Sequence, residues 1–256
     1  MIGRDALSDF LPGRTTVEER LEPDPASGRL SLARIERLGA IEIARQRLPA
    51  SAEQIAEALL QEVRQRGLAA LPWTDGDRAL RARLRFAAEA GGLPGVDLSD
   101  AFLLAHPDLW LTPRLSGVAR LADVDLSGAL LALLDWEGRQ ALDRLAPARF
   151  ESPAGTSHGI DYRAEGGPEV EVRVQALFGM ATQPMLAGGR VPLTLVLTSP
   201  AGRPLAKTRD LPAFWAKGWK DVQRDMKGRY PKHPWPDDPA SAAATTRTKA
   251  ADARRR

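Results

Sequence analysis

The sequence predicts an α+β fold in which strands at both ends flank a helical region and one long helix covers the second group of strands. Over residues 17–48 apolar and charged residues alternate, as in strands with one buried face. Over residues 51–146 the apolar residues recur instead at the three-and-four spacing of a helix. From Arg149 the alternation returns, and glycine- and proline-rich turns divide it into short strands. Separate stretches of the two periods are typical of the α+β class.

Length and composition limit the kind of protein that this chain can be. Its 256 residues allow one large domain or two modest ones. The chain has no cysteine, which excludes disulfides and thiolate metal ligands. No apolar signal-like segment follows Met1, and the longest apolar run, residues 129–134, is too short to cross a bilayer. We therefore expect a cytoplasmic protein that has no membrane partner.

The amino-terminal segments predict a small sheet. Residues 1–16 show no periodicity and are expected to be irregular. Residues 17–48 alternate, and turn-forming residues at 23–28 divide them, which predicts a β-hairpin or a meander. One face of this sheet would carry arginines, which on a strand more often keep the sheet soluble than bind a ligand: Arg29, Arg34, Arg37, Arg45 and Arg47.

The predicted helical bundle covers residues 51–146. Ser51 and Thr74 have side chains that cap helix amino termini, and Gly67 is suited to end the first helix. Three tryptophans lie within or beside these helices and are expected to pack in the core: Trp73, Trp110 and Trp136.

A second α+β region is predicted for residues 148–239. Turn residues at 166–168 and at 199–202 each separate two short runs, which predicts two hairpins in a small antiparallel sheet. Such a sheet needs one face covered, and a predicted helix over residues 210–228 would cover it. Residues 240–256 are rich in Ala, Thr and Arg, and we expect them to form a disordered basic tail.

The predicted helix over residues 210–228 has two distinct faces. Asp210 and Pro212 suit its first turn, and Gly228 suits the position just after its end. The apolar face, which we expect to lie in the core, carries Trp215, Trp219, Val222 and Met226. The neighbouring face, which we expect to be exposed, carries Lys217, Lys220, Arg224 and Lys227. An ordinary amphipathic helix whose polar face only meets water is the alternative interpretation.

Positive charge is concentrated near the carboxyl end. Residues 207–239 carry eight basic and five acidic side chains, residues 240–256 carry five and one, and the preceding residues have a net charge of −4. A local surplus of this kind is expected of a surface that binds phosphate or another polyanion, and aromatic side chains beside it can stack on bases. The candidate nucleic-acid contacts are Lys217, Lys220, Arg224, Lys227, Arg229, Tyr230, Lys232 and Trp235.

Trp235 has a second interpretation. Prolines at positions 234 and 236 hold the chain around it in an extended path, which would let the indole pack against the protein's own surface as a staple. A buried indole favours the staple, whereas an exposed indole favours a partner.

The sequence contains no recognisable active site. A phosphate-binding P-loop needs the dipeptide Gly-Lys and a DExH motor needs Asp-Glu, and neither dipeptide occurs. The glycine-rich dinucleotide motif, the zinc-protease motif and the serine-hydrolase motif are also absent from the sequence. His106, His158 and His233 are far apart, and each lies near an aspartate, as in ordinary surface pairs. We therefore predict no catalytic residue, no metal ligand and no cofactor site in this chain.

Several short motifs resemble those of one bacterial protein family. Those near the carboxyl end are LTSP at 197–200, RP at 203–204, TRDL at 208–211, FW at 214–215 and KGRYPKHPWP at 227–236. Those further upstream are RLGA at 37–40, LAALPW at 68–73, LLDW at 133–136, LFG at 177–179 and GRVPL at 189–193. Over roughly residues 17–250 the chain resembles the carboxyl-terminal part of the HrpB family of ATP-dependent helicases, which belong to the DEAH/DExH-box class.

The resemblance implies a fold and a role. Residues 17–48 would be the last strands of an oligonucleotide-binding-like (OB-like) domain, and residues 148–239 would be the α+β domain of the HrpB carboxyl terminus. The motor domains of such a helicase, which bind ATP and Mg, have no counterpart here, so this chain alone would be inactive.

We therefore expect a non-catalytic region that contributes contacts to RNA or another single-stranded nucleic acid, and that works with helicase motor domains if these are encoded separately. The alternative is a docking or scaffold module that binds a protein partner and has no nucleic-acid role of its own.

Overall fold

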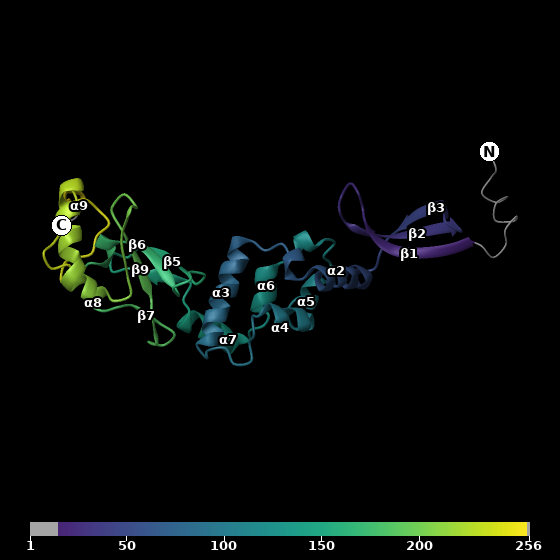
Figure 1. Ribbon diagram of the computed structural model, residues 1–256, viewed down its shortest axis with the longest axis horizontal. Helices are drawn as coiled ribbons and strands as arrows, with labels where there is room; N and C mark the ends of the chain where they lie inside the picture. The colour runs from purple at the N-terminus through teal and green to yellow at the C-terminus, as the bar shows by residue number, and fades with distance from the viewer. Residues whose placement is uncertain (1–14, 255–256) are drawn as a thin grey trace. The chain divides into compact units, whose positions relative to one another are not determined.

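The computed structural model describes residues 15–254 (Figure 1). Most of the segment predicted to be irregular, residues 1–14, lies outside the described residues, whereas Thr15 and Thr16 begin a strand. The chain divides into two compact units. The first combines Met1–Asp77 with Leu98–Leu133, and the second combines Arg78–Asp97 with Leu134–Arg256. The helices predicted over residues 51–146 are thus divided between the two units.

The first unit contains a three-stranded antiparallel meander. Strands β1 (Thr15–Pro23), β2 (Leu30–Leu38) and β3 (Ile41–Leu48) pair in the order β1-β2-β3, with a bulge in β2. Ala33 and Ile35 of the central strand are buried. The predicted hairpin or meander is therefore confirmed. Arginines of the sheet pair with carboxylates on this sheet and its turn, namely Arg34 with Glu19, Arg37 with Glu18, Arg45 with Glu22 and Glu42, and Arg47 with Asp24.

Short helices complete the first unit. They are α2 (Ala52–Arg66), η1 (Leu68–Ala70), the first residues of α3 (Asp75–Glu89), α4 (Asp100–Ala105), η2 (Pro107–Leu109), α5 (Thr112–Leu115), η3 (Leu121–Asp123) and α6 (Leu126–Leu131). Ser51 caps α2 in a reciprocal box with Gln54, and Gly67, at a φ of 73°, ends the helix as expected. Trp110 is fully buried and donates its indole N–H to the Leu103 carbonyl at 3.0 Å, which confirms its predicted place in the core.

The second unit is built on a five-stranded sheet. Its strands are β4 (Arg149–Glu151), β5 (Ser157–Asp161), β6 (Glu169–Arg173), β9 (Thr194–Thr198) and β10 (Pro204–Thr208), in the order β10-β9-β6-β5-β4. Both predicted hairpins are confirmed, because β5 pairs with β6 and β9 with β10 in antiparallel fashion.

One pairing of this sheet differs from the prediction. Strands β6 and β9 pair in parallel, with Val172 opposite Leu197, so the sheet is mixed and not wholly antiparallel. The chain between them passes through η4 (Val174–Leu177) and the small ribbon of β7 (Met185–Leu186) and β8 (Val191–Pro192). A connection of this length lets the chain return in the same direction, which a tight turn cannot do.

Helices cover the sheet of the second unit. They are the remaining residues of α3, α7 (Trp136–Leu145), α8 (Leu211–Ala213), the π turn η5 (Phe214–Gly218), α9 (Trp219–Arg229) and α10 (Lys249–Ala253). Figure 1 shows α8 and α9 on one side of β6 and β9. The core between them includes Val172, Leu195 and Leu197 from the strands and Trp215 and Trp219 from the helical segment. The α+β class, with its strands, helices and covering carboxyl-terminal helix, is therefore confirmed.

Trp136 does not lie in a core as predicted, because its side chain is 71% exposed. It occupies the first position of α7, directly after the N-cap residue Asp135. The buried residues of α7 are Leu142 and Leu145, and nine positions separate Leu145 from Trp136. Nine residues turn a helix through two and a half revolutions, so the indole points away from the buried face.

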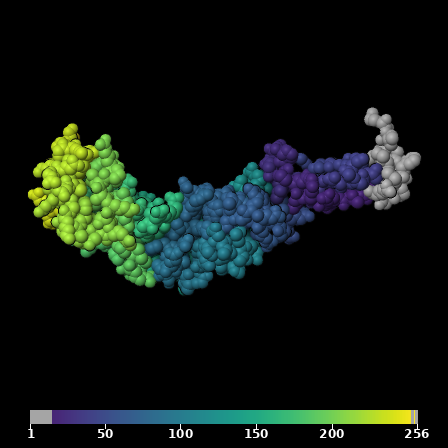
Figure 2. All heavy atoms as spheres, in the orientation of Figure 1, coloured from purple at the N-terminus to yellow at the C-terminus, as the bar shows by residue number. Residues whose placement is uncertain are grey.

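The carboxyl-terminal segment makes contacts that a disordered tail would lack. Ala240, Ala242 and Ala244 pack against the core of the second unit, and the Thr245 amide donates to the Gln175 carbonyl at 3.1 Å. In Figure 2 this yellow end of the chain lies against the light-green surface of the same unit. Alanine side chains are small enough to let a backbone approach a packed surface closely. Among residues 15–254 no helix has the length and apolar character needed to span a bilayer.

Candidate nucleic-acid interface

The segment from Asp210 to Tyr230 forms one side of the candidate interface. The Asp210 carboxylate accepts the Ala213 amide at 2.9 Å, which is the predicted N-cap, and Pro212 lies in the first turn. The helix does not end at Gly228 as predicted. Gly228 lies inside α9, and Tyr230 is the C-cap residue.

A π turn interrupts the helical segment between α8 and α9. A Cβ added to Gly218 would lie 2.8 Å from a ring carbon of Phe214, so the ring of Phe214 occupies the space that any other residue at 218 would need. The wider turn thus depends on a glycine at this position, and it leads directly into the buried Trp219 at the start of α9.

The inward face of the helix is a cluster of aromatic rings. The Trp219 ring lies 5.5 Å from the ring of Trp215 and 5.5 Å from that of Phe178, in both cases edge to face. Each indole N–H of the two tryptophans reaches a carbonyl, that of Met180 for Trp215 and that of Pro236 for Trp219, both at 2.8 Å. The predicted apolar face is therefore confirmed, with Trp215, Trp219 and Met226 buried and Val222 half-buried against them.

Trp235 is part of the same cluster and is not available to stack on a base. Its side chain is 7% exposed, and its ring stacks on Trp219 with centroids 5.9 Å apart. Its indole N–H donates to the Tyr230 carbonyl at 2.9 Å, and the Gln223 amide donates to the carbonyls of Trp235 and Pro236. The staple is the interpretation that this burial favours. The expectation that Trp235 stacks on a base does not hold, because the side chain is buried, its ring already stacks on Trp219 and its N–H already has an acceptor.

The outward face of the segment carries the predicted cations. Lys217, Lys220, Lys227 and Lys232 are exposed, and none of them makes an ion pair within the described part of the chain. Arg224 is exposed as well, and its guanidinium lies 2.5 Å from the Asp221 carboxylate one turn away. An ion pair between exposed side chains is weak, so a phosphate can compete for that arginine.

Arg229 lies on a different side of α9 from the other cations. Lys220, Arg224 and Lys227 follow one another at four and three residues and therefore share a face. Arg229 comes five residues after Arg224, which turns it about 140° around the helix. It points toward the β9–β10 hairpin, with its Nε 3.2 Å from the Asp225 carboxylate. The structure thus separates the predicted set into an outer face and a flank.

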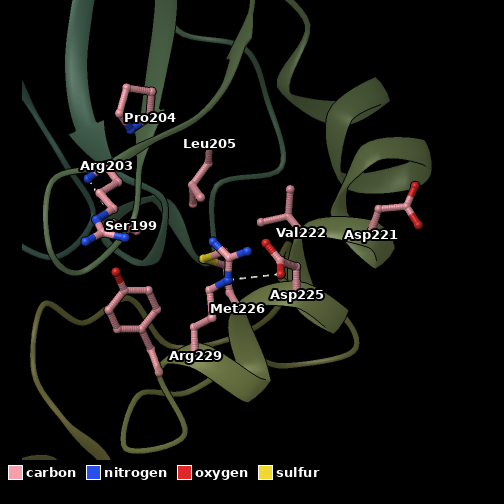
Figure 3. Close-up of a pocket in the computed structure, with 10 residues that line it drawn as sticks. Ser199, Arg203, Pro204, Leu205, Asp221, Val222, Asp225, Met226 and Arg229 are labelled. Atoms are coloured by element: carbon pink, nitrogen blue, oxygen red, sulfur yellow. Dashed lines mark hydrogen bonds and ion pairs between the residues drawn. The ribbon is translucent and has the colours of Figure 1, made fainter.

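The flank of α9 and the β9–β10 hairpin border an open cavity of about 370 Å³ (Figure 3). Arg229 and the half-buried Tyr230 line it from the helix, and Arg203 and Leu205 line it from the hairpin. Arg203 is not among the site residues that the sequence predicts. The available signal was a lone arginine directly after the turn of a predicted hairpin, which is too common a pattern to indicate a site.

The histidines have partners other than the aspartates near them in the sequence. His158 bonds to the Thr156 hydroxyl at 2.8 Å, the His106 ring packs on Phe102, and the His233 ring meets Tyr230 edge to face. Among the side chains that the structure describes, no group of three or more His, Cys, Asp or Glu is arranged to hold a metal ion.

The second unit is thus a mixed sheet closed by an aromatic helix, with residues 228–236 folded back as a staple. Residues 110–239 match the family described as ATP-dependent helicase C-terminal, that of the HrpB carboxyl terminus, and the chain belongs to this family. The predicted resemblance is therefore confirmed.

The chain is similar to proteins from Escherichia coli. The chain is 41% identical over 256 residues to the ATP-dependent RNA helicase HrpB of strain K12, an alignment that covers 97% of this chain and 31% of that protein. The crystal structure of the E. coli DExH-box NTPase HrpB superposes with a TM-score of 0.73 at 41% identity, over 97% of this chain and 31% of that one.

A second solved structure, the Escherichia coli DEAH/RHA helicase HrpB, gives a TM-score of 0.63 at 39% identity, over 88% of this chain and 29% of that one. This chain therefore spans about a third of the length of the relatives that it matches.

Proposed function

We propose that this chain is the non-catalytic carboxyl-terminal region of an HrpB-type ATP-dependent RNA helicase, and that the outer face of the helical segment η5–α9 contributes contacts to RNA. Motor domains outside this chain would bind ATP and Mg and perform the hydrolysis. The observation that supports the proposal most is the division of the helical segment at residues 211–229. Its aromatic face is buried in the core, and the lysines on the neighbouring face are exposed and make no ion pairs among the described residues.

These charges are carried by a helical segment that is anchored in the core. The helix is anchored by Trp215 and Trp219, so Lys217, Lys220 and Lys227 project from a rigid surface. Positive side chains held on one surface displace the counterions of a nucleic-acid backbone when they bind phosphates, which provides affinity independent of sequence. Lys232, in the segment that follows the helix, adds to the same positive surplus.

The test is the binding of this chain to a fluorescein-labelled oligouridine, measured by fluorescence anisotropy. We expect the variant with Lys217→Gln, Lys220→Gln and Lys227→Gln to bind several-fold more weakly than the unmodified chain. A control variant with Arg114→Gln, Arg144→Gln and Arg173→Gln loses the same charge from exposed positions elsewhere and should bind nearly as well as the unmodified chain.

Equal weakening in the two variants would show that only net charge matters and would contradict the proposed face. An unmodified chain that does not bind the oligonucleotide at low salt would contradict the proposal as a whole.

A docking module for a protein partner is the second candidate, and the exposed Trp136 favours it. A large aromatic side chain that is 71% exposed is typical of the anchors of protein interfaces. The aromatic segment after Gly228 gives this candidate no further support, because Trp235 is buried. Trp136→Ala should leave oligonucleotide binding unchanged. If it abolishes binding to separately produced motor domains while the lysine variant does not, the docking candidate is favoured.

A further inference from the structure

The cavity beside α9 has a composition that suits one chemical class of ligand. Its floor is apolar and is formed by Leu205 of β10 together with Val222 and Met226 of α9. Two arginines and the Tyr230 ring border this floor. A volume of about 370 Å³ lies within the range of pockets that hold small ligands. An apolar floor next to fixed positive charges suits a ligand that has a flat ring and an anionic group.

The hairpin holds Arg203 at one edge of the cavity. The buried Ser199 accepts the Arg203 amide on its hydroxyl at 3.0 Å, and the Ser199 amide donates to the Arg203 carbonyl at 2.8 Å. The backbone of this arginine is therefore fixed by two hydrogen bonds across the turn. Its guanidinium makes no ion pair with any carboxylate whose side chain the structure describes, so its five N–H donors can serve a ligand.

Arg229 holds the opposite edge. Its Nε lies 3.2 Å from Asp225, and that is the ion pair it forms among the described residues. Both terminal nitrogens of the guanidinium thus keep donors for an anion. Figure 3 draws this guanidinium on the cavity side of α9, with a dashed line to Asp225.

The two carboxylates of the cavity do not cancel its positive charge. Asp221 pairs with Arg224 at 2.5 Å, and Figure 3 shows its side chain directed away from Arg203 and Arg229. Asp225 pairs with Arg229. Each of the two lining carboxylates therefore has an arginine partner, Asp221 in Arg224 outside the lining and Asp225 in Arg229, and neither of them is paired with Arg203. This arrangement does not suit a cationic ligand, because such a ligand would have to displace an arginine from its partner.

We propose that this cavity binds one nucleotide of single-stranded RNA, with the phosphate between Arg203 and Arg229 and the base against the floor of Leu205, Val222 and Met226. The inference rests on the proposed function and adds to it a site distinct from the outer lysine face. Arginine presents paired donors to phosphate, and an aromatic ring such as Tyr230 stacks on bases of any identity. An acidic peptide would use the arginines but would leave the apolar floor uncovered.

The direct test is titration of the isotope-labelled chain with adenosine 5′-monophosphate, followed by amide chemical shifts. The expected shifts map to residues 199–205 and 222–230. Arg203→Met keeps most of the aliphatic stem and removes the charge, and we expect it to weaken binding about tenfold. Arg173→Met, an exposed arginine of β6 in the same unit, is the matched control and should leave the affinity unchanged.

Two further ligands separate the parts of the proposal. Inorganic phosphate should bind at the same residues but more weakly than the nucleotide, because it leaves the floor empty. Equal affinities of phosphate and nucleotide would overturn the role of the floor. A glutamate-rich peptide that binds more tightly than the nucleotide would overturn the nucleotide assignment in favour of a protein ligand.

The result with RNA distinguishes failure of this inference from failure of the proposed function. If the chain binds oligouridine but Arg203→Met binds it as well as Arg173→Met does, the cavity assignment is overturned and the lysine face stands. If oligouridine does not bind at all, the proposed function fails first, and the assignment of the cavity to RNA fails with it. Weakening by Arg203→Met in both the nucleotide and the RNA assays supports the cavity as an RNA subsite.

Discussion

Replacing Trp235 with alanine should destabilise the second unit more than any surface substitution. The side chain is 7% exposed, stacks on Trp219 and donates its N–H to the Tyr230 carbonyl at 2.9 Å. Burial of about 200 Å² of aromatic surface at about 25 cal/mol per Å² corresponds to about 5 kcal/mol. Measured truncations of buried Phe and Trp fall at about 3–5 kcal/mol. We therefore expect a loss of about 4 kcal/mol in the free energy of unfolding.

The assay is equilibrium unfolding in urea, followed by far-ultraviolet circular dichroism. Trp235→Phe keeps a stacked ring and loses the hydrogen bond, so it should cost only about 1–2 kcal/mol. Trp136→Ala is the matched control, because that indole is 71% exposed and its loss should change stability by no more than about 0.5 kcal/mol. The melting temperature of Trp235→Ala should be about 10 °C lower than that of the unmodified chain. If Trp235→Ala and Trp136→Ala cost the same, the staple interpretation is refuted.

The remaining predictions concern two glycines and two charged side chains. Gly228→Ala should stabilise α9 by about 0.5–1 kcal/mol, because nothing lies within 4 Å of the added Cβ. Gly218→Ala should destabilise the second unit, because the added Cβ would lie 2.8 Å from the Phe214 ring. The urea midpoint of unfolding should therefore rise for Gly228→Ala and fall for Gly218→Ala. Burial raises the pKa of Asp77, but hydrogen bonds from the side chains of Ser127 and Thr74 and from the Thr74 amide outweigh it and lower the pKa below its usual range. The contribution of the Asp77 carboxylate to stability is therefore fully present above about pH 3.9 and is lost as the pH falls through its folded-state pKa. In urea unfolding measured at a series of pH values, Asp77→Asn should show a smaller loss of stability at acid pH than the unmodified chain. Arg83→Met should lower the free energy of unfolding by about 1–3 kcal/mol. The largely buried Arg83 donates a hydrogen bond of 2.5 Å to the carbonyl of Ala146, the residue directly after α7, and the variant leaves that carbonyl without its donor. A melting temperature equal to that of the unmodified chain would contradict this prediction.

Local patterns in the sequence were sufficient for the elements that depend on neighbours in the chain. The hairpins around residues 166–168 and 199–202 follow from turn residues between alternating runs, and they are present. The aromatic and cationic faces of the closing helix follow from spacings of three and four residues, and Trp219 is buried as that spacing predicts. The short-range signal therefore fixed both the strands and the direction in which the helix faces.

Features that depend on distant contacts were not predictable. The parallel pairing of β6 with β9 depends on the path taken by the intervening chain, for which the sequence has no periodic signal. The π turn at Gly218 depends on where the Phe214 ring packs, and a regular helix was the default expectation. The cavity joins Arg203 and Arg229 from a hairpin and a helix, and neither residue alone has a pattern that indicates the other.

Salt dependence of RNA binding is the most direct test of the account. Each phosphate contact to a single strand adds about 0.7 to the slope of log K against log salt concentration, so removing Lys217, Lys220 and Lys227 should reduce the slope by about 2. The control that removes Arg114, Arg144 and Arg173 should keep the slope of the unmodified chain. A flat slope for the unmodified chain, or the same reduction in both variants, would contradict the claim that the outer face of η5 and α9 contacts the phosphate backbone.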